Sequence, residues 1–191
     1  VFLPGEPSEI HIVISILAQW IVLLGLLYIW LPRVERSNLS SIGFNKFEWS
    51  YLGTGLLTYI ILFILMAFTG YFLEIAGLQG LRSLQPVLSG YSFPVLFGLF
   101  ITGTFLEEVF YRGYIIERII LLTGKRWLAG VTSWLTFTLV HFNFFGLGPT
   151  LEVSVFSAVV TILYLKKRSI WPVIIVHGIN NILAYLIFPV L

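Results

Sequence analysis

Long apolar runs restrict this chain to folds that can cross a lipid bilayer. A helix that spans the hydrocarbon core needs about 20 predominantly apolar residues, and Ile10–Leu31 and Ser50–Leu73 reach that length without a charge. The other candidate runs are Phe93–Leu122, Trp127–Phe145, the shorter Leu151–Leu165, and Ile170–Pro189. We therefore predict an all-α fold, a polytopic transmembrane bundle of about six spanning helices.

Composition supports a multi-pass integral membrane protein with one domain over residues 1–191. Only 10% of the residues are charged and 58% are hydrophobic, whereas soluble domains carry about 25% charged residues. A net charge of +2 is too small to indicate nucleic acid as a partner. The chain has no Cys and no Asp, which excludes a thiolate nucleophile, an aspartate dyad and a Ser-His-Asp triad.

The basic residues predict the orientation of the bundle. If the N-terminus lies outside, one membrane face holds eight Lys and Arg residues and the opposite face holds only Arg82. The eight are Arg33, Arg36, Lys46, Lys125, Arg126, Lys166, Lys167 and Arg168. By the positive-inside rule we expect these loops to be cytoplasmic, in a bacterial or organellar inner membrane. The mixed linker Gly77–Ser92 is expected to form a short surface or re-entrant helix.

Three charges lie in the middle of the third apolar run, at Glu107, Glu108 and Arg112, where burial in lipid costs several kcal/mol or more and indicates a functional site. Glu108 and Arg112 are four residues apart, with the acid first, which places them on one helix face as an ion pair. We expect this buried pair to be a structural clamp. Glu107 is rotated by about 100° and is left free to act as a general base.

Polar residues interrupt two other runs at His141, His177 and Asn181. Counting about 1.5 Å per residue from the basic side, Glu107 and His141 both lie roughly 21–23 Å deep, Asn181 roughly 16 Å and His177 roughly 10 Å. His177 and Asn181 share one helix face because they are four residues apart. A lone buried His is often an interhelical hydrogen-bond partner, but three polar clusters together favour a catalytic centre.

The motifs around these residues resemble those of one family. EEVFYRG (Glu107 to Gly113), FTLVH (Phe137 to His141) and HGINN (His177 to Asn181) are similar to the EExxxR, FxxxH and HxxxN motifs of the CPBP family. This family contains CAAX proteases and bacteriocin-processing enzymes, and is also called Abi or Rce1-like. The resemblance covers the C-terminal part, residues 93–191, and the three motifs occur in the family's order on separate helices.

The resemblance implies an intramembrane glutamate-type endopeptidase that needs no cofactor. In the family's mechanism, Glu107 and His141 would activate a water molecule, while His177 and Asn181 would form the oxyanion hole. Glu108 and Arg112 would hold the helix and orient Glu107. The implied partners are a peptide or membrane-protein substrate, the bilayer and a membrane partner subunit.

Three alternatives remain open from the residues alone. Glu107, His141 and His177 together form a ligand set that suits catalytic zinc, although no HExxH motif brings two ligands onto one helix. A non-catalytic membrane scaffold or bacteriocin-immunity protein of the same family would tolerate loss of Glu107. A proton-coupled transporter would also bury such charges but would more often show an inverted repeat, and the sequence shows none.

Overall fold

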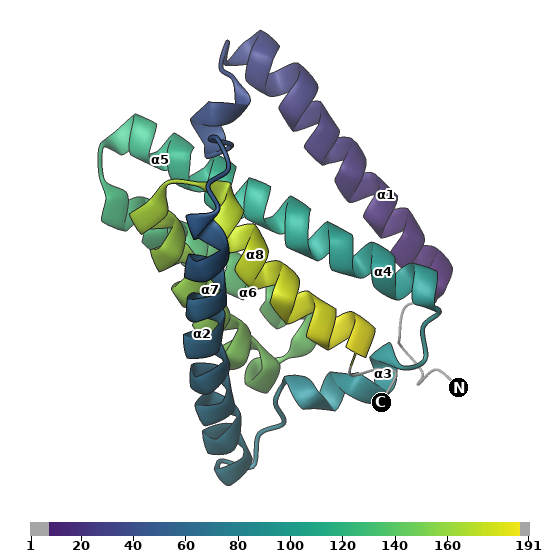
Figure 1. The fold of residues 1–191 in the computed structure, drawn as a ribbon. Coiled ribbons are helices and arrows are strands. Elements are labelled where there is room, and N and C mark those ends of the chain that lie inside the picture. Colours follow the sequence, from purple (N-terminus) through teal and green to yellow (C-terminus); the bar gives the residue numbers. More distant parts are fainter. Residues whose placement is uncertain (1–7, 188–191) are drawn as a thin grey trace.

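The computed structural model describes residues 8–187. This range contains helices and connecting segments but no strand, which confirms the predicted all-α class (Figure 1). The segments, with η marking 3-10 or π-helical backbone, are α1 (Glu9–Gly25), η1 (Leu26–Val34), η2 (Leu39–Ile42), α2 (Ser50–Ile75), η3 (Leu81–Leu84), α3 (Gln85–Leu88), α4 (Phe93–Thr102), η4 (Gly103–Ile115), α5 (Ile116–Thr123), α6 (Arg126–Phe145), α7 (Leu147–Lys167), α8 (Ile170–Asn181) and η5 (Ile182–Ile187).

Six stretches of this range are long and apolar enough to cross a membrane, as predicted. They are Glu9–Val34, Ser50–Ile75, Phe93–Thr123, Arg126–Phe145, Leu147–Lys167 and Ile170–Ile187. The predicted end of the last span at Pro189 lies outside the described residues. Burial is uneven. In α7, 61% of the 18-residue apolar stretch is buried inside the protein, whereas in α2 only 11% of the corresponding stretch is buried. The fifth span is therefore the central one, shielded by its neighbours.

The predicted end of the first helix is wrong. The helix does not stop before Pro32, because its backbone widens into the π-helical η1 and continues to Val34 with the proline inside. Proline lacks an N–H and its ring clashes with an ordinary α-helical turn. A π-helical turn has a different hydrogen-bond pattern, and the proline is accommodated there.

The predicted start of the fifth span is also wrong. It begins at Leu147, four residues before Leu151, because Gly146 reverses the chain directly after α6 with φ 74°. Glycine adopts such positive φ values without steric cost. Pro149 then falls in the first helical turn, where a missing N–H does no harm. Thr150, which follows Pro149, consequently lies inside the helix.

The third span changes its helical type at the acidic motif. An ordinary α-helix runs from Phe93 to Thr102, the π-helical η4 follows from Gly103 to Ile115, and α5 completes the span at Thr123. π-helical turns are rare and often occur at functional sites. Glu107, Glu108 and Arg112 all lie in this widened segment.

α8, which crosses the centre of the view in Figure 1, packs against α2, α7 and η4. Its first backbone N–H, from Ile170, donates a 2.9 Å hydrogen bond to the carbonyl of Gly43. Gly43 has φ 86°, and a methyl group in its place would lie 2.6 Å from the Tyr164 hydroxyl. The loop between the first two spans is thus folded into the bundle and determines where α8 starts.

The linker between α2 and α4 forms two short helical segments, η3 and α3, which confirms the expected short helix. Glutamates from two spans hold its ends. The backbone N–H of Leu81 donates to the Glu152 carboxylate, and that of Ser92 donates to the Glu9 carboxylate. α3 lies near the end of α8 and its continuation η5 (Figure 1), so the linker covers that end of the bundle.

Candidate active site

Glu108 and Arg112 form a fully buried ion pair. Arg112 Nη1 lies 3.0 Å from Glu108 Oε1, and both side chains have 0% exposure. Arg112 also donates through Nη2 to Ser157 Oγ at 3.1 Å, and its guanidinium lies 4.2 Å from the centre of the Phe137 ring. These contacts join the third span to α6 and α7. The side chains are therefore arranged as the predicted clamp requires.

His177 is the third member of this buried cluster, and the sequence did not predict that contact. Its Nδ1 lies 2.6 Å from Glu108 Oε1, the oxygen that also accepts from Arg112. Because Glu108 is paired with Arg112, its carboxylate is charged and accepts, so Nδ1 of His177 carries the proton. Glu108 therefore orients the imidazole of His177 as well as pairing with Arg112.

The depth estimate for His177 is wrong for a structural reason. The third span is 31 residues long, so its basic-side end extends past the level at which α8 begins. A methyl group on Gly113 would lie 3.5 Å from Ile170 Cδ1, so the start of α8 lies beside Gly113 and not beside the end of α5. Antiparallel packing from that point brings His177 to Glu108.

Glycines allow the two helices to approach closely farther along the same contact. A methyl group on Gly178 would lie 3.4 Å from Thr104 Cγ2. A methyl group on Gly103 would lie 3.0 Å from Asn181 Nδ2 and 3.7 Å from Glu107 Oε1. Small residues at helix interfaces in membranes allow the two backbones to approach closely. Asn181 and the Glu107 carboxylate are thus brought to the same glycine.

Glu107 differs from Glu108 in its surroundings. Among residues 8–187 its carboxylate has no hydrogen-bond partner, and the residue is half-buried, whereas Glu108 is fully enclosed. Glu107 interacts electrostatically with His177 and His141. Its side chain is therefore not occupied by a structural contact with another described residue.

Phe137 holds His141 in two ways. The carbonyl of Phe137 lies 2.7 Å from His141 Nδ1, and the two rings stack with centroids 4.4 Å apart. A carbonyl can only accept, so Nδ1 carries the proton and Nε2 of the neutral ring keeps its lone pair. The opposite neighbour of the Phe137 ring is the Arg112 guanidinium. The sequence identified Phe137 only as part of a motif and not by these contacts.

Asn181 is buried, with 5% exposure, and donates from Nδ2 to Thr104 Oγ1 at 3.3 Å. The amide has a second N–H that this bond does not use. The structure thus places His177 and Asn181 on the face of α8 that contacts η4. Thr104, which fixes the amide, lies one helical turn before Glu108 and belongs to no predicted motif.

The residues do not form a metal site in this arrangement. Among the described residues, no three His, Asp or Glu side chains are placed to bind one metal ion. The zinc set of Glu107, His141 and His177 is therefore not assembled, because His177 is directed to Glu108. The zinc alternative gains no support.

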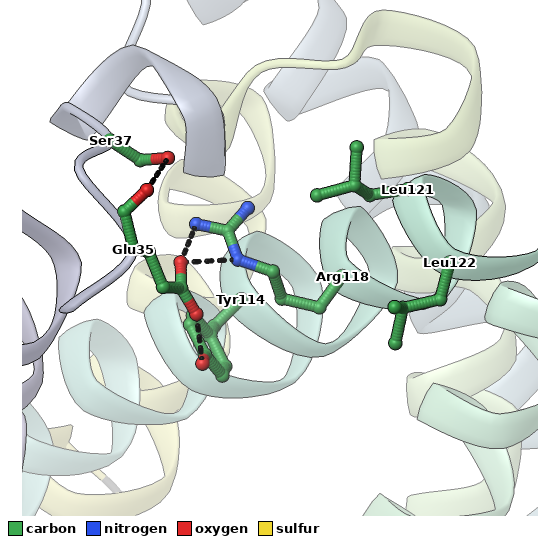
Figure 2. A pocket seen from close by; sticks show the side chains of 6 residues that line it. All are labelled: Glu35, Ser37, Tyr114, Arg118, Leu121 and Leu122. Atoms are coloured by element: carbon green, nitrogen blue, oxygen red, sulfur yellow. Dashed lines mark hydrogen bonds and ion pairs between the residues drawn. The ribbon is translucent and has the colours of Figure 1, made fainter.

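A second polar cluster lies away from these residues, at the end of the first span (Figure 2). Arg118 pairs with Glu35 at 2.6 Å, and Tyr114 and Trp30 donate to the same carboxylate at 2.6 and 2.9 Å. Burial raises the pKa of Glu35, but these hydrogen bonds and the Arg118 charge outweigh it, so the pKa is lowered overall. The cluster links the end of the first span to α5. Glu35, Tyr114 and Arg118, together with Ser37, line a cavity of about 380 Å³.

A separate apolar cavity of about 350 Å³ lies between the first span and the third, lined by residues that include Trp20, Phe44 and Val109. Neither this cavity nor the one beside Arg118 is lined by Glu107, His141, His177 or Asn181. Glu107, His177 and Asn181 therefore lie at the contact between η4 and α8, and His141 lies on α6, outside both of these cavities.

Comparison with known proteins identifies the family. Residues 89–183 match the family described as type II CAAX prenyl endopeptidase Rce1-like. The match covers about half of the chain, contains all three motifs and leaves out the first two spans. No curated protein and no solved structure matched the chain. The six helices of residues 8–187 that are able to span a membrane and this match together show that the chain is an integral membrane protein belonging to the Rce1-like family of proteases.

Proposed function

We propose that this chain is an intramembrane endopeptidase in which Glu107 is the general base. The observation that supports this most is the contrast between the two adjacent glutamates. Glu108 is neutralised by Arg112 and hydrogen-bonded to His177. Glu107 has no such partner among the described residues and lies across Gly103 from Asn181. A free carboxylate beside an amide donor suits hydrolysis of a peptide bond.

The nucleophile in this proposal is a water molecule bound between Glu107 and His141. Glu107 takes a proton from the water while its oxygen attacks the carbonyl carbon of the substrate. Nε2 of His141 keeps a lone pair and accepts the second hydrogen of the water, which fixes its orientation. The proton on Glu107 then passes to the departing amine nitrogen as the C–N bond breaks, so the carboxylate is regenerated.

The oxyanion of the tetrahedral intermediate is stabilised by Asn181 and His177. Asn181 has one N–H free after its bond to Thr104. Nδ1 of His177 already donates to Glu108, so His177 must be doubly protonated to donate from Nε2 as well. Loss of one such donor costs about 3 kcal/mol in transition-state energy in comparable sites.

The test compares wild-type protein with Glu107→Gln, which keeps size and hydrogen-bonding reach but removes the base. Both are reconstituted in vesicles with a fluorogenic CAAX peptide, in prenylated and unprenylated forms. We expect a loss of at least about 10²-fold in cleavage rate with unchanged peptide binding and melting. Glu74→Gln, an exposed glutamate on α2, is the control and should cleave normally.

The same assay separates the competing functions. Undiminished cleavage by Glu107→Gln would contradict the glutamate mechanism. A scaffold would keep its biological effect in cells that carry Glu107→Gln, because its contacts are unchanged. Activity that disappears on chelation and returns with added zinc would support the metal alternative instead.

A further inference from the structure

The polar face of α8 continues one turn beyond the residues that the family motifs contain. His177, Asn181 and Tyr185 are spaced four residues apart, so they follow one another along one face of α8 and η5. Tyr185 lies outside the matched residues 89–183 and belongs to none of the three motifs. The first two of these residues contact the third span through Glu108 and Thr104.

The antiparallel register places Tyr185 against α4, one turn beyond Gly103. Its ring packs against a cluster that contains Val95 and Leu96. Helical side chains lean toward the N-terminus of their own helix, so we expect the phenol of Tyr185 to lean toward Asn181. Glu107 leans toward Gly103 by the same rule, and its Oε1 is found there. This rule directs the hydroxyl and the carboxylate toward one another from the two helices.

The side-chain interactions of Tyr185 agree with this placement. Its phenol interacts electrostatically with Glu107. Its hydroxyl makes no hydrogen bond to any other residue within the range 8–187. The remaining groups that interact electrostatically with Glu107 are His141 on α6, His177 on α8, and Glu108, Tyr111 and Arg112 on its own segment η4. A phenol and a carboxylate without partners leave both available to a bound molecule.

We propose that Tyr185 is a further catalytic residue, whose hydroxyl donates a hydrogen bond to the substrate's carbonyl oxygen beside Asn181. This proposal rests on the proposed peptidase function. The carbonyl oxygen gains negative charge when water adds to the carbon, so a neutral O–H donor binds the transition state more strongly than the ground state. The bond involves no proton transfer, because the phenol remains protonated throughout.

The test is Tyr185→Phe, which removes only the hydroxyl, measured in the vesicle cleavage assay. We expect kcat to fall by about 10-fold or more, while KM and the melting temperature stay at their wild-type values. Tyr59→Phe is the matched control, because Tyr59 is also a half-buried tyrosine in a span but lies in α2, away from Glu107. The control should retain full activity.

Several results would overturn the assignment. Wild-type kcat in Tyr185→Phe, or a change in KM alone, would show that the hydroxyl does not stabilise the transition state. A displaced pH profile of kcat would show that the hydroxyl acts on the ionisation of Glu107 and not on the substrate oxygen. A parallel loss of melting temperature would show a structural role. If the wild-type protein cleaved no peptide, the proposed function would fail together with this one. Normal cleavage by Tyr185→Phe beside inactive Glu107→Gln would reject Tyr185 alone.

Discussion

Replacing Arg112 with Leu should destabilise the protein strongly, because it leaves the Glu108 carboxylate buried without its ion-pair partner. Both side chains have 0% exposure, and the pair is separated by 3.0 Å. Breaking a buried pair by removing one partner typically costs about 3–5 kcal/mol. The variant also loses the bond to Ser157 and the contact with the Phe137 ring, so the upper part of this range is expected.

The assay is thermal unfolding of the purified protein in detergent. With about 2–4 °C per kcal/mol for a chain of this size, Arg112→Leu should melt about 6–20 °C below the wild-type protein. The double variant Glu108→Leu with Arg112→Leu removes the stranded charge and should recover much of that loss. Arg118→Leu breaks a pair with partly exposed side chains and should cost less.

The clamp and the chemistry can be separated by these variants. If Arg112→Leu melted like the wild-type protein while activity disappeared, Arg112 would belong to the reaction and the clamp role would be refuted. If the double variant were no more stable than Arg112→Leu, the stranded carboxylate would not be the cause of the loss. The coupling energy of the double-mutant cycle measures that difference directly.

Two further predictions follow from other contacts. The pKa of Glu35 is lowered in the folded protein, so the stabilising effect of its carboxylate should be complete above the unfolded pKa of about 4.3 and disappear as pH falls through the folded pKa. The difference in melting temperature between the wild-type protein and Glu35→Gln should therefore narrow on acidification. A difference that is independent of pH would contradict this. Gly103→Ala would place a methyl group 3.0 Å from Asn181 Nδ2, which is too close without movement of the amide. Cleavage should fall more than melting temperature, and normal kcat in this variant would show that the Asn181 position is not critical.

The architecture could be predicted from the sequence, because a segment that crosses the membrane must be composed mainly of apolar residues. Six long apolar runs predict six spanning helices, and all six are present in the described residues. The i,i+4 spacing of Glu108 and Arg112 predicted their ion pair, since both residues belong to one helix and their separation is local. The helix boundaries at Pro32 and Leu151 were less predictable. Pro32 does not end the first helix, because the backbone there is π-helical, and the fifth span begins before Pro149, because Gly146 turns the chain.

The site itself could be predicted only as a set of residues. Glu107, His141, His177 and Asn181 were identified as the polar exceptions in apolar helices, but their roles remain predictions to be tested by the variants above. Contact between Glu108 and His177 could not be foreseen from depth counting. That count assumed that every helix ends at the same level, whereas the loop at Gly43 determines where α8 begins.

Local sequence thus determined which segments are helical and which residues are too polar to face lipid. Only the tertiary structure decided which of those polar residues meet. The glutamates are adjacent in sequence and chemically identical, yet Glu108 is enclosed by Arg112 and His177 while Glu107 lies across Gly103 from Asn181. Their difference arises because neighbouring positions on a helix face different partners, and the relative height and rotation of two helices depend on packing between them and not on either sequence alone.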